Sequence, residues 1–241
     1  MNAGTQPPTM PAAHAGPDIA PPPDALCLDT RLTLRDGAIV RMRAIRPDDM
    51  DRLRRLHSRL SADAIVFRFF RLLPQLSEEM AERFTHVDYV SRMALVATVG
   101  SGAAEEIVAV VRYDRMDTTT AEVAFVVQDD WQGKGIATAL LYHLAAYGRA
   151  HGYTRFVAIT MSSNARMIEV LRFAGFPFQM RYVGGDVEAS LDITAPPSPP
   201  FAPGGFAPPI APSPAEPAEP AEPAEPAERH DGQTDASERE A

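Results

Sequence analysis

A short run with two glycines, Gln132 to Ala137, is the clearest chemical signal in the sequence, since it leads into a long helical pattern. Glycine lacks a Cβ atom, so its backbone N–H can approach a ligand closely and its φ angle can be positive. The N-terminus of the following helix adds about half a positive charge. We therefore expect the turn to bind an anion such as a pyrophosphate.

Two common phosphate-binding motifs do not fit this turn. A P-loop has four residues between its first glycine and a Gly-Lys pair, followed by Ser or Thr, whereas Gly135 follows Lys134 here. A Rossmann turn would have its third glycine at Thr138, and the preceding strand patterns are consecutive rather than separated by helices. A tight turn that only caps a helix stays open as a purely structural interpretation.

The elements that must position this turn follow from hydrophobic periodicity and from turn residues. Helical spacing predicts helices over 49–60, 61–70 and 77–84, a long helix from 136, and another from 164 to 175. Apolar or alternating runs predict strands over 38–45, 93–99, 106–113, 122–127, 156–160, 179–183 and 187–193. This order predicts an α+β fold with helices packed on a mixed sheet.

Proline and charge separate the two ends of the chain from its middle. Of 23 prolines, seven precede residue 25 and thirteen follow residue 194, and the net charge of −9 also falls on the ends. Residues 26–193 balance 21 basic against 21 acidic side chains. We therefore expect one domain over 26–193 between a disordered arm, 1–25, and a disordered Pro/Ala/Glu-rich tail, 194–241.

Composition also excludes several classes of protein. The neutral middle argues against a nucleic-acid partner, which requires a basic face. The single cysteine, Cys27, excludes a disulfide framework and a four-cysteine zinc site. Residues 1–26 lack the features of a secretory signal, and no apolar run is long enough to span a membrane. We expect a cytoplasmic protein with no membrane partner; the sequence does not indicate an oligomeric state.

The stretch 122–176 resembles the acetyl-CoA-binding core of the GNAT superfamily of N-acetyltransferases. The signature of that family is Gln or Arg, two residues, Gly, one residue, then Gly or Ala, and it is matched by Gln132, Gly135 and Ala137. The family also has an Asn that opens a helix ending in Gly-Phe, as Asn164 does eleven residues before Gly175. The resemblance implies a GNAT-like, mostly antiparallel mixed sheet with helices on both faces.

A narrower likeness lies in 67–70, 84–89 and 92–96, which resemble segments of the bacterial protein lysine acetyltransferases that inactivate acyl-CoA synthetases. The resemblance implies that Glu122 is the general base that takes a proton from the attacking amine. The backbone of Ala124, Phe125 and Val126 would hold the acetyl carbonyl and the pantetheine. Acetyl-CoA would further be bound by the amides of Gln132, Gly133, Lys134, Gly135, Ile136 and Ala137, and by Asn164 and Arg172. No metal is required.

Three residues leave alternatives open. Without the resemblance, an acid two residues after a Thr-rich turn, as Glu122 is, is usually a solvated residue at the start of a strand. His86 is a candidate for the substrate pocket, although a hydrogen-bonded structural histidine has the same sequence context. Many GNAT enzymes have a tyrosine at the position of Leu171 as general acid to the departing thiolate. Here either the thiolate leaves unassisted, or Tyr113 or Tyr182 substitutes.

We therefore expect an acetyl-CoA-dependent N-acetyltransferase that acetylates a protein lysine by direct transfer in a ternary complex. The expected partner is an AMP-forming acyl-CoA synthetase. Two alternatives stay open: a small-molecule amine as the acceptor, and a non-catalytic acyl-CoA-binding regulatory module.

Overall fold

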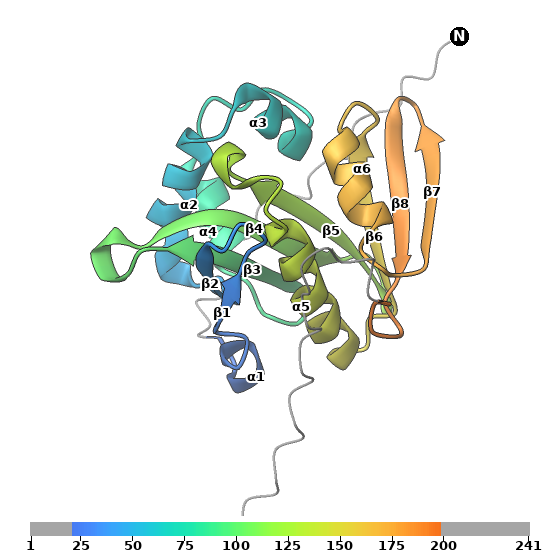
Figure 1. Ribbon diagram of the computed structural model, residues 1–241, viewed down its shortest axis with the longest axis horizontal. Coiled ribbons are helices and arrows are strands. Elements are labelled where there is room, and N and C mark those ends of the chain that lie inside the picture. Colours follow the sequence, from blue (N-terminus) through green and yellow to red (C-terminus); the bar gives the residue numbers. More distant parts are fainter. Residues whose placement is uncertain (1–20, 199–241) are drawn as a thin grey trace, which may run out of the picture. The chain divides into compact units, whose positions relative to one another are not determined.

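The computed structural model describes residues 21–198, so nearly all of the two expected arms lies outside the described residues. Figure 1 shows the arrangement of the helices and strands. The strands are β1 (Thr30–Thr33), β2 (Ile39–Ala44), β3 (Arg92–Val99), β4 (Glu106–Arg115), β5 (Thr120–Val127), β6 (Arg155–Met161), β7 (Phe178–Val183) and β8 (Asp186–Asp192). The α-helices are α1 (Pro23–Leu26), α2 (Met50–Ser58), α3 (Ala62–Phe69), α4 (Glu78–Thr85), α5 (Ile136–Ala150) and α6 (Ala165–Arg172). Three short 3-10 turns complete the set: η1 (Pro47–Asp49), η2 (Gly102–Ala104) and η3 (Asp129–Trp131).

The strands form a single sheet in the order β1-β2-β3-β4-β5-β6-β8-β7. Neighbours are antiparallel except β5 and β6, which are parallel. The expected α+β fold with a mostly antiparallel mixed sheet is therefore confirmed. The three consecutive strands of the sequence pattern, β3, β4 and β5, lie side by side as a meander.

The helices cover both faces of this sheet. Figure 1 shows α2, α3 and α4 on one face and α5 on the other. Helix α2 packs on β4, α3 packs on β5 and β6, and α5 packs on β3, β4 and β5. The ring of Tyr142 in α5 meets that of Phe176, which follows α6, at a centroid distance of 6.0 Å. In the region 21–198, no helix is long and apolar enough to cross a membrane.

Local sequence explains where the helices begin. Ser61 and Ser77 precede α3 and α4, and each side-chain oxygen accepts a hydrogen bond from the amide three residues later, at 3.2 Å in both cases. These bonds satisfy one of the orphan amides at each helix start. Helix α2 buries Leu53 and Leu56 and exposes the arginines of its opposite face, as its amphipathic pattern predicts.

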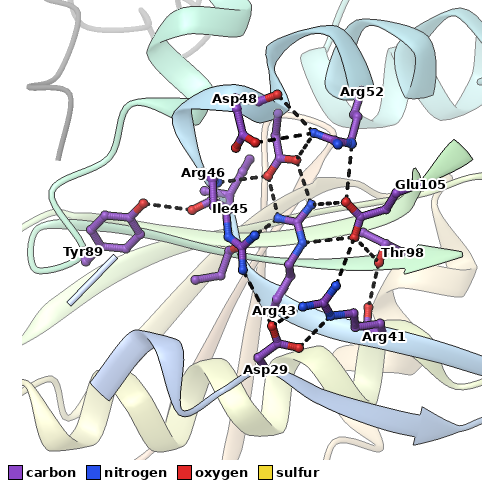
Figure 2. A network of polar contacts seen from close by, with 12 residues as sticks. Asp29, Arg41, Arg43, Ile45, Arg46, Asp48, Arg52, Tyr89, Thr98 and Glu105 are labelled. Atoms are coloured by element: carbon purple, nitrogen blue, oxygen red, sulfur yellow. Dashed lines mark hydrogen bonds and ion pairs between the residues drawn. The ribbon is translucent and has the colours of Figure 1, made fainter. Parts of the chain in front are cut away.

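A buried ion network fixes α2 to the sheet (Figure 2). The guanidinium of Arg43 in β2 donates to both carboxylate oxygens of Asp49, at 2.6 and 2.7 Å, and to Glu105, at 3.3 and 3.1 Å. Arg43 is only 1 % exposed and Asp49 is fully buried. Arg52 of α2 joins the same two carboxylates. The network thereby joins β2, the start of α2 and the turn before β4.

Order begins earlier than the sequence suggests. The short helix α1 precedes the expected start at residue 26, and Ala25 is fully buried in the core. Its single proline, Pro23, fits because the first turn of a helix tolerates a residue without an N–H. At the other end, the described chain continues past residue 193, and the amide of Ser198 donates to the carbonyl of Gly175 at 2.8 Å.

Candidate active site

Strands β5 and β6 pair for only three residues at their N-terminal ends. The last paired residues are Glu122 and Val157, although β5 continues to Val127 and β6 to Met161. Beyond Glu122, the backbone of β5 is bonded to β4 on one side and has no partner strand on the other within 21–198. The predicted cofactor residues Ala124, Phe125 and Val126 all lie on this half-open stretch. A ligand with amide groups can pair with such a strand edge.

The glycine turn connects the end of β5 to α5. Gly133 and Gly135 have φ angles of 76° and 89°, in the left-handed region that other residues rarely adopt. The six successive amides from Gly133 to Thr138 donate to no group in the described part of the chain, and α5 has no side-chain cap. These amides and the helix dipole together form an anion-binding arrangement. The predicted site residues Ile136 and Ala137 are the first two residues of α5.

The side chain of Gln132 ties this turn to two other elements. Its Nε2 donates to the carbonyl of Val127 at 3.0 Å, and its Oε1 accepts from Arg166 at 2.6 Å. Arg166 lies in the first turn of α6, 34 residues away in sequence. A positive charge therefore stands beside the free amides. Sequence reasoning missed Arg166, because only the packing of α6 brings it to the turn.

Lys134 points toward the β1–β2 turn. Its Nζ pairs with Asp36 at 2.8 Å and lies 4.8 Å from the ring centroid of Trp131. The amide of Arg35 also donates to the carbonyl of Lys134 at 3.3 Å. The lysine thus joins the hairpin to the glycine turn, and its backbone amide remains available.

The two predicted cofactor residues on α6 lie at opposite ends of that helix. Asn164 caps its start: the side-chain oxygen accepts from the amide of Met167 at 3.2 Å, and Nδ2 donates to Thr160 at 3.1 Å. Arg172 is the last residue of α6, is exposed, and makes a weak contact with the sulfur of Met180 at 3.9 Å. Arg166, at the start of the helix, is the arginine that reaches the glycine turn.

Glu122 lies opposite Asp114 in the β4–β5 ladder. Arg112 holds Asp114 through two hydrogen bonds of 2.9 and 3.3 Å. Although burial opposes it, the charge of Arg112 holds the pKa of Asp114 below its usual range. Burial, together with the charge of Asp114, raises the pKa of Glu122, against the attraction of Arg68 and Arg112. Two neighbouring carboxyls pushed apart in pKa are typical of an acid–base site.

A small cavity of about 40 Å³ adjoins the face of β5 that carries Glu122, Ala124 and Val126. Its lining is mainly apolar and comes from α2, α3, α4, β4 and β5, including Leu56, Phe84 and Ala124. The buried ring of His57 also lines it, and its Nε2 atom has no hydrogen-bond partner in the described region. His86 does not line it. Instead, Nδ1 of His86 bonds to the carbonyl of Glu82 at 3.0 Å, which matches the structural interpretation of that residue.

The candidates for general acid lie in different environments. Leu171 is fully buried in the core. Tyr113 is also buried, donates to the carbonyl of Val90 at 3.2 Å and has a pKa raised chiefly by burial. Its neighbours on β4, Arg112 and Asp114, point to the opposite face, because side chains alternate along a strand. Tyr182 lies on β7 and is 66 % exposed. None of these tyrosines stands beside Glu122.

The fold and this site define an acyltransferase, and comparison with known proteins identifies the family. The Acetyltransferase (GNAT) family matches residues 64–176. The solved GNAT domain of PAT from S. lividans is 39 % identical in sequence and superposes with a TM-score of 0.64. The match covers 69 % of this chain and 97 % of that domain. The chain belongs to the Acetyltransferase (GNAT) family.

Individual relatives are also acyltransferases by name. Acetyltransferase PA5475 of Pseudomonas aeruginosa is 29 % identical over 145 residues, which are 60 % of this chain and 78 % of that protein. Acetyltransferase Pat of Mycolicibacterium smegmatis is 28 % identical over 172 residues, and the match covers 70 % of this chain. A solved cAMP-binding acyltransferase from Mycobacterium smegmatis is 27 % identical, with a TM-score of 0.50 over 73 % of this chain. This chain spans half the length of each of these two larger proteins.

Proposed function

We propose that this chain is an acetyl-CoA-dependent N-acetyltransferase that transfers the acetyl group to a lysine of a protein, with Glu122 as general base. The observation that carries the proposal is the position of Glu122 at the point where β5 and β6 cease to pair. There, a carboxyl with a raised pKa adjoins the open edge of β5, and the free amides of the glycine turn follow at the end of the same strand.

Acetyl-CoA fits this arrangement in two parts. Its pyrophosphate would accept hydrogen bonds from the amides of Gly133 to Thr138, with additional attraction from Arg166. Its pantetheine amides would pair with the open backbone of 123–127, and one Nδ2 hydrogen of Asn164 that Thr160 does not take would reach the same arm. We assign Arg166 to the cofactor in preference to Arg172, because Arg166 already contacts the turn.

The chemistry then requires few groups. The acceptor amine arrives as an ammonium, and Glu122 takes its proton directly or through a water molecule. The neutral amine attacks the thioester carbonyl, so an N–C bond forms and the negative charge on oxygen is stabilised by backbone N–H groups of β5. The C–S bond then breaks, the thiolate of coenzyme A leaves, and the surplus proton of the attacking nitrogen passes to water, which leaves a neutral amide. Because Leu171 cannot donate a proton, we propose that the thiolate departs unassisted, which its low basicity permits.

The likeness to Pat supports a protein acceptor. The closely matching solved domain is named PAT, and the segments 67–70, 84–89 and 92–96 resemble bacterial protein lysine acetyltransferases. The first two segments include the ends of α3 and α4, whose Arg68, Phe69 and Phe84 line the cavity together with Arg112 and Ala124, and the third lies in β3. We propose an AMP-forming acyl-CoA synthetase as the substrate. A small-molecule amine is the second candidate.

Acetylation of a cell lysate tests this proposal. The protein and acetyl-CoA are incubated with a lysate of the source organism, and acetylated lysines are identified by mass spectrometry. Lys134 is the only lysine in this chain, so self-acetylation is confined to that residue and the N-terminus. We expect new acetyl-lysine on an acyl-CoA synthetase, lost with Glu122→Gln and retained with Glu79→Gln, a substitution of an exposed glutamate. Transfer only to small amines would contradict the protein acceptor.

A further inference from the structure

Four charged side chains gather beside the cavity on the α2–α4 side of the sheet. Arg112 and Asp114 of β4 and Glu122 of β5 share this face, since Asp114 is directly opposite Glu122 and Arg112 is opposite Ala124. Arg68 of α3 completes the cluster, and lines the cavity together with Arg112 and Ala124. Facing carboxyls on antiparallel strands repel each other. Because of this repulsion, the charges of Arg68 and Arg112 influence which of the two carboxyls is ionised.

Arg112 is paired with one of these carboxyls, that of Asp114. It makes two hydrogen bonds to Asp114 and its guanidinium lies 4.8 Å from the ring centroid of Phe84. A two-point contact of this kind fixes the position of the carboxylate. The side chain of Glu122, in contrast, has no hydrogen bond or ion pair with any residue of the described region. Its carboxyl is free to accept a proton.

Arg68 is the second arginine of the cluster, and its guanidinium is not paired. It lies 5.2 Å from the ring centroid of Phe69 and 5.8 Å from that of Phe84, and makes no hydrogen bond or ion pair within 21–198. Burial, reinforced by the charge of Arg112, lowers its pKa to about 10, so that it is still cationic near neutral pH. Arg68 is partly buried, and a cation that is partly removed from water without a partner is costly. The uncommitted carboxyl of the cluster is Glu122.

We propose that Arg68 is a positioning residue that keeps Glu122 ionised, and therefore ready to take the proton of the acceptor amine. This inference rests on the proposed function. The aromatic rings of Phe69 and Phe84 hold the guanidinium in place, and Arg112 prevents Asp114 from binding it. Arg68 thus acts on Glu122 through its charge, while the lone pairs of the carboxylate remain available to the acceptor.

The charged groups that face Glu122 determine whether each substitution raises or lowers the pKa of its carboxyl. From α3 it meets Arg68, from β4 it meets Arg112 and Asp114, and its partner in β6 is the apolar Val157. Removing the charge of Arg68 favours the protonated carboxyl and raises the pKa of Glu122. Removing the charge of Asp114 has the opposite effect, because it ends the repulsion and releases Arg112. If Arg68 and Asp114 had a purely structural role, their removal would not shift the pKa of Glu122 in opposite directions.

Titration by ¹³C NMR of the full chain, labelled at glutamate carboxyls, tests the proposal without any acceptor. The Glu122 signal is identified by its loss in Glu122→Gln. We expect its midpoint to move up in Arg68→Met, to move down in Asp114→Asn, and to stay unchanged in Arg68→Lys and in Arg71→Met, whose arginine is exposed nearby. Circular dichroism checks the fold. If Arg68→Met does not fold, Arg68→Gln, which keeps a polar group but no charge, takes its place.

Transfer rates provide the second readout. In the lysate assay, we expect Arg68→Met to lower the ratio of the rate at pH 6 to that at pH 8.5 by about fivefold or more, since the carboxyl then protonates at higher pH. An unchanged Glu122 midpoint in folded Arg68→Met and Arg68→Gln overturns the inference and leaves the proposed function intact. Full transfer by Glu122→Gln overturns the role of Glu122 as general base in the proposed function, whereas the NMR midpoints still decide whether Arg68 sets the pKa of Glu122.

Discussion

Replacing Arg43 by methionine tests how much the buried network of Figure 2 contributes to folding. The substitution removes five hydrogen bonds, four of them to Asp49 and Glu105, and leaves the carboxylates of these two residues buried. Breaking a buried ion pair in this way costs about 3–5 kcal/mol. Asp49 keeps bonds from the amide of Arg46, at 2.9 Å, and from Arg52, at 3.3 Å, so we expect the lower end of that range. For a domain of this size, about 3 kcal/mol lowers the midpoint of thermal unfolding by about 6–12 °C.

Arg41 provides a matched control on the same strand. It also makes a two-point contact, with Asp29 at 2.7 and 2.6 Å, but its side chain is 47 % exposed. Exposed pairs contribute at most about 1 kcal/mol, so Arg41→Met should be nearly neutral. The assay is thermal and urea unfolding followed by circular dichroism. Equal losses of stability in Arg43→Met and Arg41→Met would refute the argument from burial.

The same network predicts a pH dependence of stability. Burial disfavours the charged form of Glu105, but hydrogen bonding and the charge of Arg43 outweigh it and hold the pKa of Glu105 below its usual range. Its contribution is therefore fully present above the unfolded-state pKa of about 4.3 and is lost as the pH falls through the lower folded-state pKa. In Glu105→Gln, this loss of folding stability at low pH should be absent.

Further predictions concern the site itself. Gly135→Val places a β-branched residue at a φ of 89°, so we expect the KM for acetyl-CoA to rise about tenfold, measured by steady-state kinetics. Arg166→Met should raise the same KM by about threefold at low salt, whereas Arg172→Met should have little effect; equal effects would return Arg172 to the cofactor site. Because burial and Asp114 raise the pKa of Glu122 and the base acts in its ionised form, kcat/KM should fall as the pH drops through that raised pKa. The acid limb of the profile should be absent in Glu122→Gln.

The strongly periodic elements could be predicted from the sequence. The pattern over 49–60 corresponds to α2, and the long helix after the glycine turn begins at Ile136 as expected. Helix α1 was missed because the three prolines at 21–23 indicate disorder, although proline is well tolerated in a first helical turn. The Arg43 network was also missed, since Glu105 is 62 residues away and only the fold of the sheet brings the two together.

The residues of the proposed site also fall into those that the sequence predicted and those that depend on the packing of the fold. The glycines and Glu122 of the proposed site were predicted from motifs, which depend on local spacing. Arg68 and Arg166 were not, because their placement depends on how α3 and α6 pack against the sheet. One local signal was available: Arg112 and Asp114 alternate on β4, so they share a face, and the strand that follows carries Glu122.

The rate of acetyl transfer by Glu122→Gln is the most direct test of the central claim. The substitution keeps the size of the side chain and removes the proton acceptor, and acetyl-CoA binding can be measured separately by calorimetry. We predict unchanged binding and a loss of transfer of at least about a hundredfold, which is the usual contribution of a general base. A variant that binds acetyl-CoA and transfers acetyl at the original rate would contradict the claim that Glu122 is the base.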